Sequence, residues 1–434
     1  MQKNKISANE AWKEIIKKYD IINRINKNGI FHIKASEIKE FKEPRLMAKW
    51  DCTSALPEAL RNNKINILPN SRSSYVLGRF NLYEELPELT ESVNKMDSAE
   101  LPALETIDIN SITSESAAIC ILIISGILDD FLGDRDTVET FNGRMGTGEF
   151  DFSVNTVDGG KQIISVKNAQ CEIDGGFEND KDVIILEAKN VVHEDFHIRQ
   201  LYYPYRLWEQ KVSKPIRLVF SVYSNMIFRL FEYRFLDKNN YSSIELVKAK
   251  NYSLQETHIE ISDLVEIRNL TKIIFDDDCR EDDNVPFIQA NSFERVISLL
   301  ENLKENAMTK EQIAELMEFD ERQSDYYYNA GAYLGLFVKR IEGSGKRVTL
   351  TRLGEQILTM NYKERQLKFV QLMLQHQIFA DCFDSIIETG ELIEISEIEK
   401  LMRKYNVCKS TSTIHRRASS VQCWIKWVFN LVNL

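Results

Sequence analysis

Two acidic residues and a lysine at a defined spacing carry the most informative chemistry in this chain. Asp174 ends one predicted strand, and Glu187-Ala-Lys189 ends the next, which is apolar. Because side chains alternate along a strand, Glu187 and Lys189 lie on one face, and Asp174 joins them if the strands pair across residues 175–180. Two adjacent carboxylates form a hard-oxygen site for Mg²⁺, and a neighbouring lysine can polarise an attacking water.

A surface ion pair is the alternative interpretation, because an isolated Glu-x-Lys is common on strands. The run Val183-Ile-Ile-Leu186 favours the functional interpretation, since it predicts a buried central strand. A Glu and a Lys at the end of such a strand are costly to desolvate unless they are used.

The spacing Asp-x₁₂-Glu-x-Lys, after a helix with an early Glu, resembles the PD-(D/E)xK nuclease core. Over residues 140–250 the chain resembles one group of type II restriction endonucleases. The segments that carry this resemblance are Gly143-Arg-Met-Gly-Thr-Gly148, Gln170-Cys-Glu-Ile-Asp-Gly-Gly176, Leu186-Glu-Ala-Lys-Asn190, Arg199-Gln-Leu-Tyr-Tyr-Pro-Tyr-Arg206 and Tyr223-Ser-Asn225.

The resemblance implies a role for each of these groups. Asp174 and Glu187 are expected to be the Mg²⁺ ligands, Lys189 the catalytic lysine, and Glu115 an accessory acid from the first helix of the core. Gln200, just after the Glu-Ala-Lys strand, is expected either to support the active site or to lie on a helix surface.

Two features of the first strand leave the ligand set partly open. Ile173 stands where the family motif has a proline, which is a frequent variation in such enzymes. Glu172 lies two residues before Asp174, on the same strand face, and could compete for the ligand role.

Basic and aromatic residues near this site are candidates for contact with the DNA backbone. They are Arg144, Arg199, Tyr203 and Arg206. The alternative for the last three is a packed helix whose arginines reach past apolar neighbours to solvent.

His193-Glu-Asp-Phe-His197 matches the zinc-peptidase signature H-E-x-x-H. That chemistry requires both histidines on one face of a helix, with a third ligand nearby. Here the motif directly follows a buried strand, so we expect neither a peptidase site nor a stoichiometric zinc. The chain also lacks a G-x-x-x-x-G-K-[ST] phosphate loop, the usual signature of ATPases, and a G-x-S-x-G elbow, the usual signature of serine hydrolases.

Residues 285–358 have the element order of a winged helix: helix, helix-turn-helix and a two-stranded wing. Gln323 and Asn329 in its second helix could contact bases, and Lys346 and Arg347 in the wing could contact phosphates. The alternative is a wing that packs against a neighbouring domain.

The elements that must position these residues predict an α/β protein. We expect an α+β N-terminal domain at 1–105, which is a candidate for DNA recognition, and a nuclease core of mixed sheet with flanking helices at 106–280. The winged helix at 285–358 and a basic helical segment at 359–434 should follow. Within them we expect an apolar helix over 115–131 capped by Ser114, a helix near 196–212, and a linker or surface excursion at 84–105.

The charge of this 434-residue chain is uneven. The net charge is −11, yet residues 1–50 carry twelve Lys or Arg against six acids, and residues 401–434 carry six and no acid. Basic ends on an acidic body suit a protein that binds phosphates with some of its surfaces, although a random mosaic of charge is equally compatible. Seven scattered cysteines without a Cys-x-x-Cys pair indicate a reducing compartment, the cytoplasm.

Together these features predict a Mg²⁺-dependent endonuclease that cuts double-stranded DNA. The resemblance implies that it is a type II restriction enzyme and that it leaves 5′-phosphate ends. By family analogy we expect a homodimer and a companion DNA methyltransferase, in a restriction-modification system that defends against viruses. The alternative is a winged-helix DNA-binding regulator whose nuclease-like core is inactive.

Overall fold

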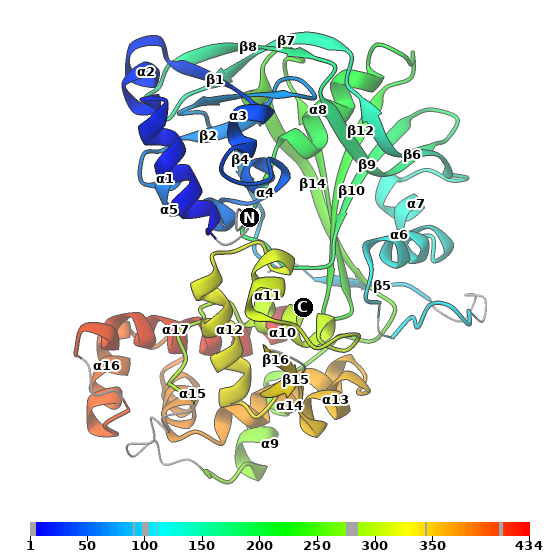
Figure 1. Cartoon of the computed structure of the whole chain (residues 1–434). Coiled ribbons are helices and arrows are strands. Elements are labelled where there is room, and N and C mark those ends of the chain that lie inside the picture. Colours follow the sequence, from blue (N-terminus) through cyan, green and yellow to red (C-terminus); the bar gives the residue numbers. More distant parts are fainter. Residues whose placement is uncertain are drawn as a thin grey trace.

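The computed structural model is a mixed α/β protein with a helical C-terminal region (Figure 1). It describes residues 6–89, 92–97, 104–110, 112–274, 285–342, 345–407 and 411–434. The acidic run 276–283, two residues of the expected wing turn (343 and 344), and Cys279 and Cys408 lie outside these ranges.

The N-terminal region packs short helices against a small antiparallel sheet of order β1-β3-β2. Helix α1 begins at a reciprocal capping box formed by Ser7 and Glu10. Trp12 is fully buried, and its indole nitrogen donates to the Met47 carbonyl at 3.0 Å. The elements are α1 (Ala8–Lys18), α2 (Ile21–Asn28), β1 (Ile30–Lys34), α3 (Ala35–Lys39), α4 (Arg45–Ala48), η1 (Thr53–Ala55), α5 (Glu58–Arg61), β2 (Asn66–Pro69) and β3 (Ser74–Gly78).

A seven-stranded mixed sheet of order β5-β14-β13-β12-β10-β9-β6 forms the centre of the molecule. Its elements are β5 (Val93–Lys95), α6 (Glu115–Ile124), α7 (Ile127–Leu132), β6 (Val138–Gly146), β9 (Gln170–Glu178), β10 (Val183–Lys189), α8 (Arg199–Trp208), β12 (Ile216–Ser224), β13 (Ile227–Phe235), η2 (Tyr241–Ser243) and β14 (Ile244–Ser253). The strand pairs β7 (Glu149–Asn155) with β8 (Lys161–Lys167), and β4 (Tyr83–Glu85) with β11 (Asp195–His197), lie outside this sheet.

Helices cover both faces of the sheet. Helices α6 and α7 share a core with Ile184, Leu186 and Ala188 of β10, whereas Ile185 faces the side on which α8 packs. Strand alternation therefore directs Glu187 and Lys189 toward α8. The β10–α8–β12 crossover joins two parallel strands, the connection for which a covering helix is normally required.

Two local predictions were wrong. The single helix expected over 115–131 is two helices, because the chain turns at Gly126 with φ of 72°; the Ser114 cap is confirmed. The stretch 84–105 is not only a linker, since β4 pairs with β11 and β5 extends the sheet beside β14.

The C-terminal region is helical apart from one hairpin. Its elements are α9 (Ile261–Leu270), α10 (Phe293–Asn302), α11 (Lys310–Leu316), α12 (Glu321–Tyr333), β15 (Phe337–Glu342), β16 (Gly345–Leu350), α13 (Arg352–Leu358), α14 (Tyr362–Leu374), α15 (Gln377–Thr389), α16 (Ile395–Lys404), α17 (Thr411–Asn430) and η3 (Leu431–Asn433). The order of helices and hairpin over 293–358 is the one that the sequence predicts. Thr309 and Gln312 form a capping box at the start of α11.

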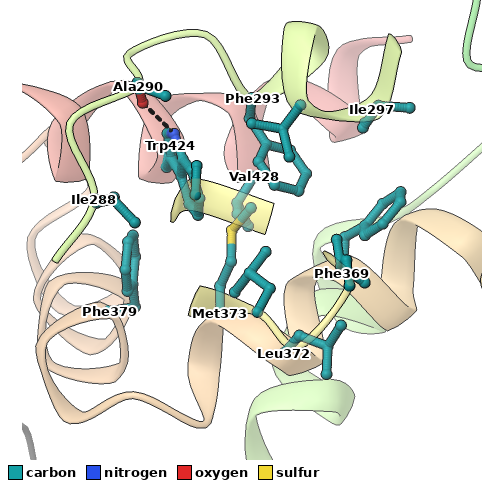
Figure 2. Close-up of a cluster of buried hydrophobic side chains, with 14 of the residues drawn as sticks. Ile288, Ala290, Phe293, Ile297, Phe369, Leu372, Met373, Phe379, Trp424 and Val428 are labelled. Carbon is teal, nitrogen blue, oxygen red and sulfur yellow. Dashed lines mark hydrogen bonds between the residues drawn. The ribbon is translucent and has the colours of Figure 1, made fainter. Parts of the chain in front are cut away.

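One hydrophobic core runs through the whole C-terminal region, and Figure 2 shows its centre. Trp424 is fully buried and donates from its indole nitrogen to the Ala290 carbonyl at 2.8 Å. The Phe293 ring contacts both Trp424 and Trp427. The two tryptophans of the basic C-terminal segment thus belong to the core and hold α17 against α10.

The packing of α12 against the hairpin makes a testable prediction. A Cβ added at Gly331 would overlap the ring of buried Phe337, so Gly331→Ala should lower the free energy of unfolding by about 1–3 kcal/mol. At an unconstrained helix position the same change would raise it by about 1 kcal/mol. Urea denaturation measures the sign, and Gly345→Ala is the control, because its Cβ would meet nothing within 4 Å. A stabilised Gly331→Ala protein would contradict this packing.

Candidate active site

The antiparallel pairing of β9 with β10 ends at a point where their side chains can form a site. The ladder runs from Val183 opposite Glu178 to Leu186 opposite Gly175. One residue further, Asp174 Oδ2 accepts a hydrogen bond from the backbone N–H of Ala188 at 3.0 Å. At this position of β10 a side-chain carboxylate accepts the hydrogen bond that a backbone carbonyl of β9 would otherwise accept. Asp174 is therefore fixed beside the residues that end β10.

Glu187, Lys189 and Gln200 form one buried cluster on the α8 side of the sheet. Lys189 Nζ lies 2.7 Å from Glu187 Oε1, and Gln200 Nε2 from the first turn of α8 donates to the same oxygen. Glu187 is only 7% exposed. Of the two alternatives for Gln200, the structure has the first geometry: the side chain is buried against Glu187 and does not lie on an outer helix surface.

Glu115 approaches this cluster from the other side, at the first residue of α6. The Ser114 cap fixes the start of that helix, with its side chain accepting from the Ala117 backbone N–H. Desolvation raises the pKa of the Glu115 carboxyl, Lys189 opposes that shift, and Asp174 adds to it. These mutual effects place Glu115 within electrostatic reach of both Asp174 and Lys189.

The cluster contains more carboxylates than cations, and this excess governs its protonation. Burial raises the pKa of Glu187 to about 8; Lys189 opposes the shift and Asp174 adds to it. Burial disfavours the charged form of Lys189, but the surrounding carboxylates outweigh burial and raise its pKa well above the usual value. At neutral pH the lysine is therefore charged, and Glu187 retains a proton unless another cation compensates its charge.

Sequence reasoning missed two further acids that reach Lys189. Asp51, which follows α4, is buried and lies 3.3 Å from Arg199 and 3.5 Å from Lys49. Burial opposes its ionisation, but Arg199 and Lys189 hold the pKa of the Asp51 carboxyl below its usual range.

The second missed acid is Glu318, in the turn between α11 and α12. Burial raises the pKa of Glu318 to about 7, with a further contribution from Asp51, while Lys189 opposes it. Neither acid follows a motif, and each lies more than one hundred residues from the Glu-Ala-Lys strand. Only the tertiary fold reveals them.

Two of the predicted DNA contacts near the site, Tyr203 and Arg206, are corrected by their burial. Tyr203 is fully buried with its hydroxyl 2.8 Å from the Pro69 carbonyl, and Arg206 is 5% exposed. Arg206 donates to the carbonyls of Asp151 and Lys238 and lies over the Phe150 ring. These two side chains hold α8 in place and are not accessible to a phosphate backbone. Arg199 is half-buried and pairs with Asp51 at 3.3 Å.

The remaining predicted contacts are accessible to differing degrees. Arg144 is exposed and pairs with Glu172 at 3.1 Å, so Glu172 has a partner other than Asp174 or Glu187. Lys346 is exposed. Arg347 is half-buried and donates to the Ala307 carbonyl at 3.0 Å and to Gln312. Gln323 and Asn329 are half-buried on α12.

The H-E-x-x-H segment does not form a helix and so lacks the geometry that the peptidase motif requires. Residues 193 and 194 precede β11, and His197 lies in that strand. His197 Nδ1 contacts the Tyr241 hydroxyl at 3.1 Å, and burial lowers the pKa of His197 to about 3. The two histidines therefore do not share a helical face.

Three domain families match successive parts of the chain. The models are a domain of unknown function (DUF6996) over residues 9–77, a domain of unknown function (DUF6997) over 78–253, and a domain of unknown function (DUF7226) over 295–433. Neither a curated protein nor a solved structure matches the chain. No helix in the described ranges combines the length and the apolar character needed to cross a membrane.

The burial of Arg206 predicts a structural phenotype. Arg206→Ala should lower the free energy of unfolding by about 3 kcal/mol, because the buried guanidinium loses its packing over Phe150, its ion pair with half-buried Glu209 and its hydrogen bonds to the Asp151 and Lys238 carbonyls. Arg144→Ala, at an exposed arginine, should change it by less than about 0.5 kcal/mol. Chemical denaturation of both variants measures the difference, and equal stabilities would contradict the structural role of Arg206.

Proposed function

We propose that this protein is a Mg²⁺-dependent endonuclease acting on double-stranded DNA, of the PD-(D/E)xK type found in type II restriction enzymes. The observation that carries the proposal is the meeting of Asp174, in the middle of β9, with Glu187 and Lys189 at the point where the pairing of β9 with β10 ends. Glu115 lies within electrostatic reach of the same groups. A surface ion pair consists of one acid and one base, whereas here strand pairing brings two acids and a lysine together.

The donor chemistry fits a hard divalent cation. Asp174 and Glu187 offer carboxylate oxygens, the ligands that Mg²⁺ prefers, and Glu115 offers another on the opposite side. Glu187 is buried and retains a proton at neutral pH, so a bound cation would replace that proton. When bound, Mg²⁺ would activate a water and stabilise the charge that develops on the phosphate.

The chain's own residues would orient the reaction. Lys189, charged and held against Glu187 Oε1, would position the attacking water and the negative phosphate oxygens. Gln200 donates to the same oxygen of Glu187 and so fixes the direction in which that carboxylate presents its other oxygen. Cleavage of this kind would leave 5′-phosphate and 3′-hydroxyl ends, as the resemblance implies.

The arrangement of elements supports a nuclease core. Helices α6 and α7, strands β6, β9 and β10, helix α8 and strand β12 follow one another, and the acids lie where β10 ends. Ends of strands beside a crossover are common places for active sites in α/β proteins. A homodimer and a companion methyltransferase remain expectations from the family.

We propose further that the segment from α10 to α13 is a winged helix that contributes to DNA binding. Helices α11 and α12 are joined by a short turn, and the β15–β16 hairpin follows directly. Exposed Lys346 on the hairpin and half-buried Asn329 on α12 are the groups available for phosphate and base contacts.

The catalytic assignment predicts that cutting separates from binding. Glu187→Gln, Asp174→Asn and Lys189→Ala should each abolish Mg²⁺-dependent cleavage of plasmid DNA while gel-shift binding persists. Ca²⁺ should support binding without cleavage, since it fills an oxygen site but positions water poorly. Glu172→Gln is the matched control: it removes an exposed carboxylate from the same strand, and its activity should be kept. Full activity in the Glu187 or Lys189 variant would eliminate this site, and binding without any cleavage in the native protein would favour the regulator alternative.

The raised pKa of Glu187 predicts that cation binding releases a proton. Because the pKa of Glu187 is about 8, the side chain is mostly protonated at lower pH, whereas a cation binds only the ionised carboxylate. Calorimetric titration with Ca²⁺, in buffers of different ionisation enthalpy, should show about one proton released per ion at pH 7 and progressively less above pH 8. Affinity should rise with pH up to about pH 8 and then level off. Glu172→Gln should not change this release, whereas absence of release at pH 7 would show that Glu187 is already ionised.

The wing predicts two distinct effects on DNA binding. Lys346→Ala should reduce the slope of log K against log salt by roughly 0.9, the value for one phosphate contact, whatever the DNA sequence. Asn329→Ala should reduce discrimination between cognate and other sites by about 1–3 kcal/mol if it contacts a base edge. Lys400→Ala, an exposed lysine on α16, is the control and should leave the slope unchanged. Unchanged slope and unchanged preference would assign the hairpin to assembly.

A further inference from the structure

A second group of potential ligands lies near the carboxylate site and has a different chemistry. Cys52, His193 and Glu318 each offer one donor atom, and these three atoms lie within 4.8 Å of one another. A thiol, an imidazole and a carboxylate are the donors of borderline transition metals, chiefly Zn²⁺, and not those of Mg²⁺.

The group is buried, and two of its members have unsatisfied polar atoms. Cys52 is 1% exposed and His193 is 7% exposed. Within the described ranges, His193 Nδ1 and Glu318 Oε2 are both shielded from solvent and have no hydrogen-bond partner. Because buried polar atoms are nearly always paired, two such atoms in one small cluster call for a ligand.

Hydrogen bonding inside the protein accounts for the thiol but not for its neighbours. Cys52 Sγ donates to the Glu318 carbonyl at 3.0 Å, and Ser54 Oγ donates to the same carbonyl at 3.0 Å. Within the described residues, Glu318 Oε2 and His193 Nδ1 remain without a hydrogen-bond partner beside this thiol. A purely structural thiol would not require an imidazole and a carboxylate beside it.

The backbone around each ligand is held firmly by contacts between distant segments. The Asp51 carbonyl accepts from His197 N–H at 2.7 Å, and Thr53 N–H donates to Asp195 at 2.8 Å, which fixes Cys52 against β11. Arg295 donates to the Met317 carbonyl at 2.7 Å and so positions the turn that carries Glu318. The cluster is therefore preorganised.

We propose that Cys52, His193 and Glu318 bind one Zn²⁺ ion, with a fourth coordination position open to water. The three residues come from the three segments that match separate domain families, 9–77, 78–253 and 295–433. A metal bound by all three would fasten the N-terminal and C-terminal regions to the central sheet and fix Glu318 near Lys189. This site is independent of the proposed nuclease activity.

The proposal departs from the expectation, based on the H-E-x-x-H motif, that the protein holds no zinc. The motif fails because His197 is not available, whereas His193 meets ligands that are distant in sequence. The peptidase site and the proposed zinc site differ in their ligands, because a peptidase site requires His197 and the proposed site requires Cys52.

Metal analysis of the full-length protein tests the proposal. After removal of loosely bound metal and reconstitution with one equivalent of Zn²⁺, mass spectrometry of the metal content should find about one zinc per chain. With Co²⁺ in its place, a thiolate-to-metal charge-transfer band should appear, a signature that only a cysteine ligand gives. Zinc should also raise the melting temperature, and a chelator should reverse this.

Variants distinguish this site from other zinc binding. Cys52→Ser and His193→Ala should each weaken zinc binding by at least about tenfold, the loss that removal of a supporting partner alone produces. Cys52→Ser should also abolish the charge-transfer band. His197→Ala and Cys382→Ala, a buried cysteine in α15, should keep the metal. A native protein without zinc or a cobalt–thiolate band would overturn the proposal, as would undiminished binding in Cys52→Ser.

Discussion

The buried contact between Glu187 and Lys189 is the constraint on which the rest of the structure depends. Ionisable groups at the end of a central strand are expensive to desolvate: burial keeps Glu187 protonated at neutral pH, and the charge of Lys189 requires additional partners. Here Gln200 donates to Glu187, while Glu115, Glu318 and Asp51 act on Lys189. The surrounding elements are arranged to supply these partners.

This requirement explains why the flanking regions pack against the sheet. Asp51 belongs to the N-terminal region and also pairs with half-buried Arg199, which begins α8. Glu318 arrives from the turn before α12, and Arg295 fixes that turn. The regions matched by separate families thus share one electrostatic centre. If the proposed zinc binds at Cys52, His193 and Glu318, it reinforces the same junction.

Local patterns in the sequence predicted local structure and the nearest site residues. The apolar run before Glu187 predicted β10, and the capping residue Ser114 predicted the start of α6. Strand alternation and pairing placed Asp174 beside Ala188, one residue from Glu187. Contacts between distant segments were not predictable, because neither Asp51 nor Glu318 carries a local signal. The same limit explains why the DNA-contact prediction for Arg206 was wrong. A helix rich in basic and aromatic residues can lie against DNA or be buried in the protein, and its sequence alone does not distinguish the two.

Digestion of unmethylated DNA of mixed sequence, with every end mapped by sequencing, tests the central claim most directly. With Mg²⁺, the account predicts double-strand breaks at a recurring sequence, carrying 5′-phosphates and disappearing when the cation is chelated. DNA left intact with Mg²⁺, or cut equally well in the presence of a chelator, would contradict it.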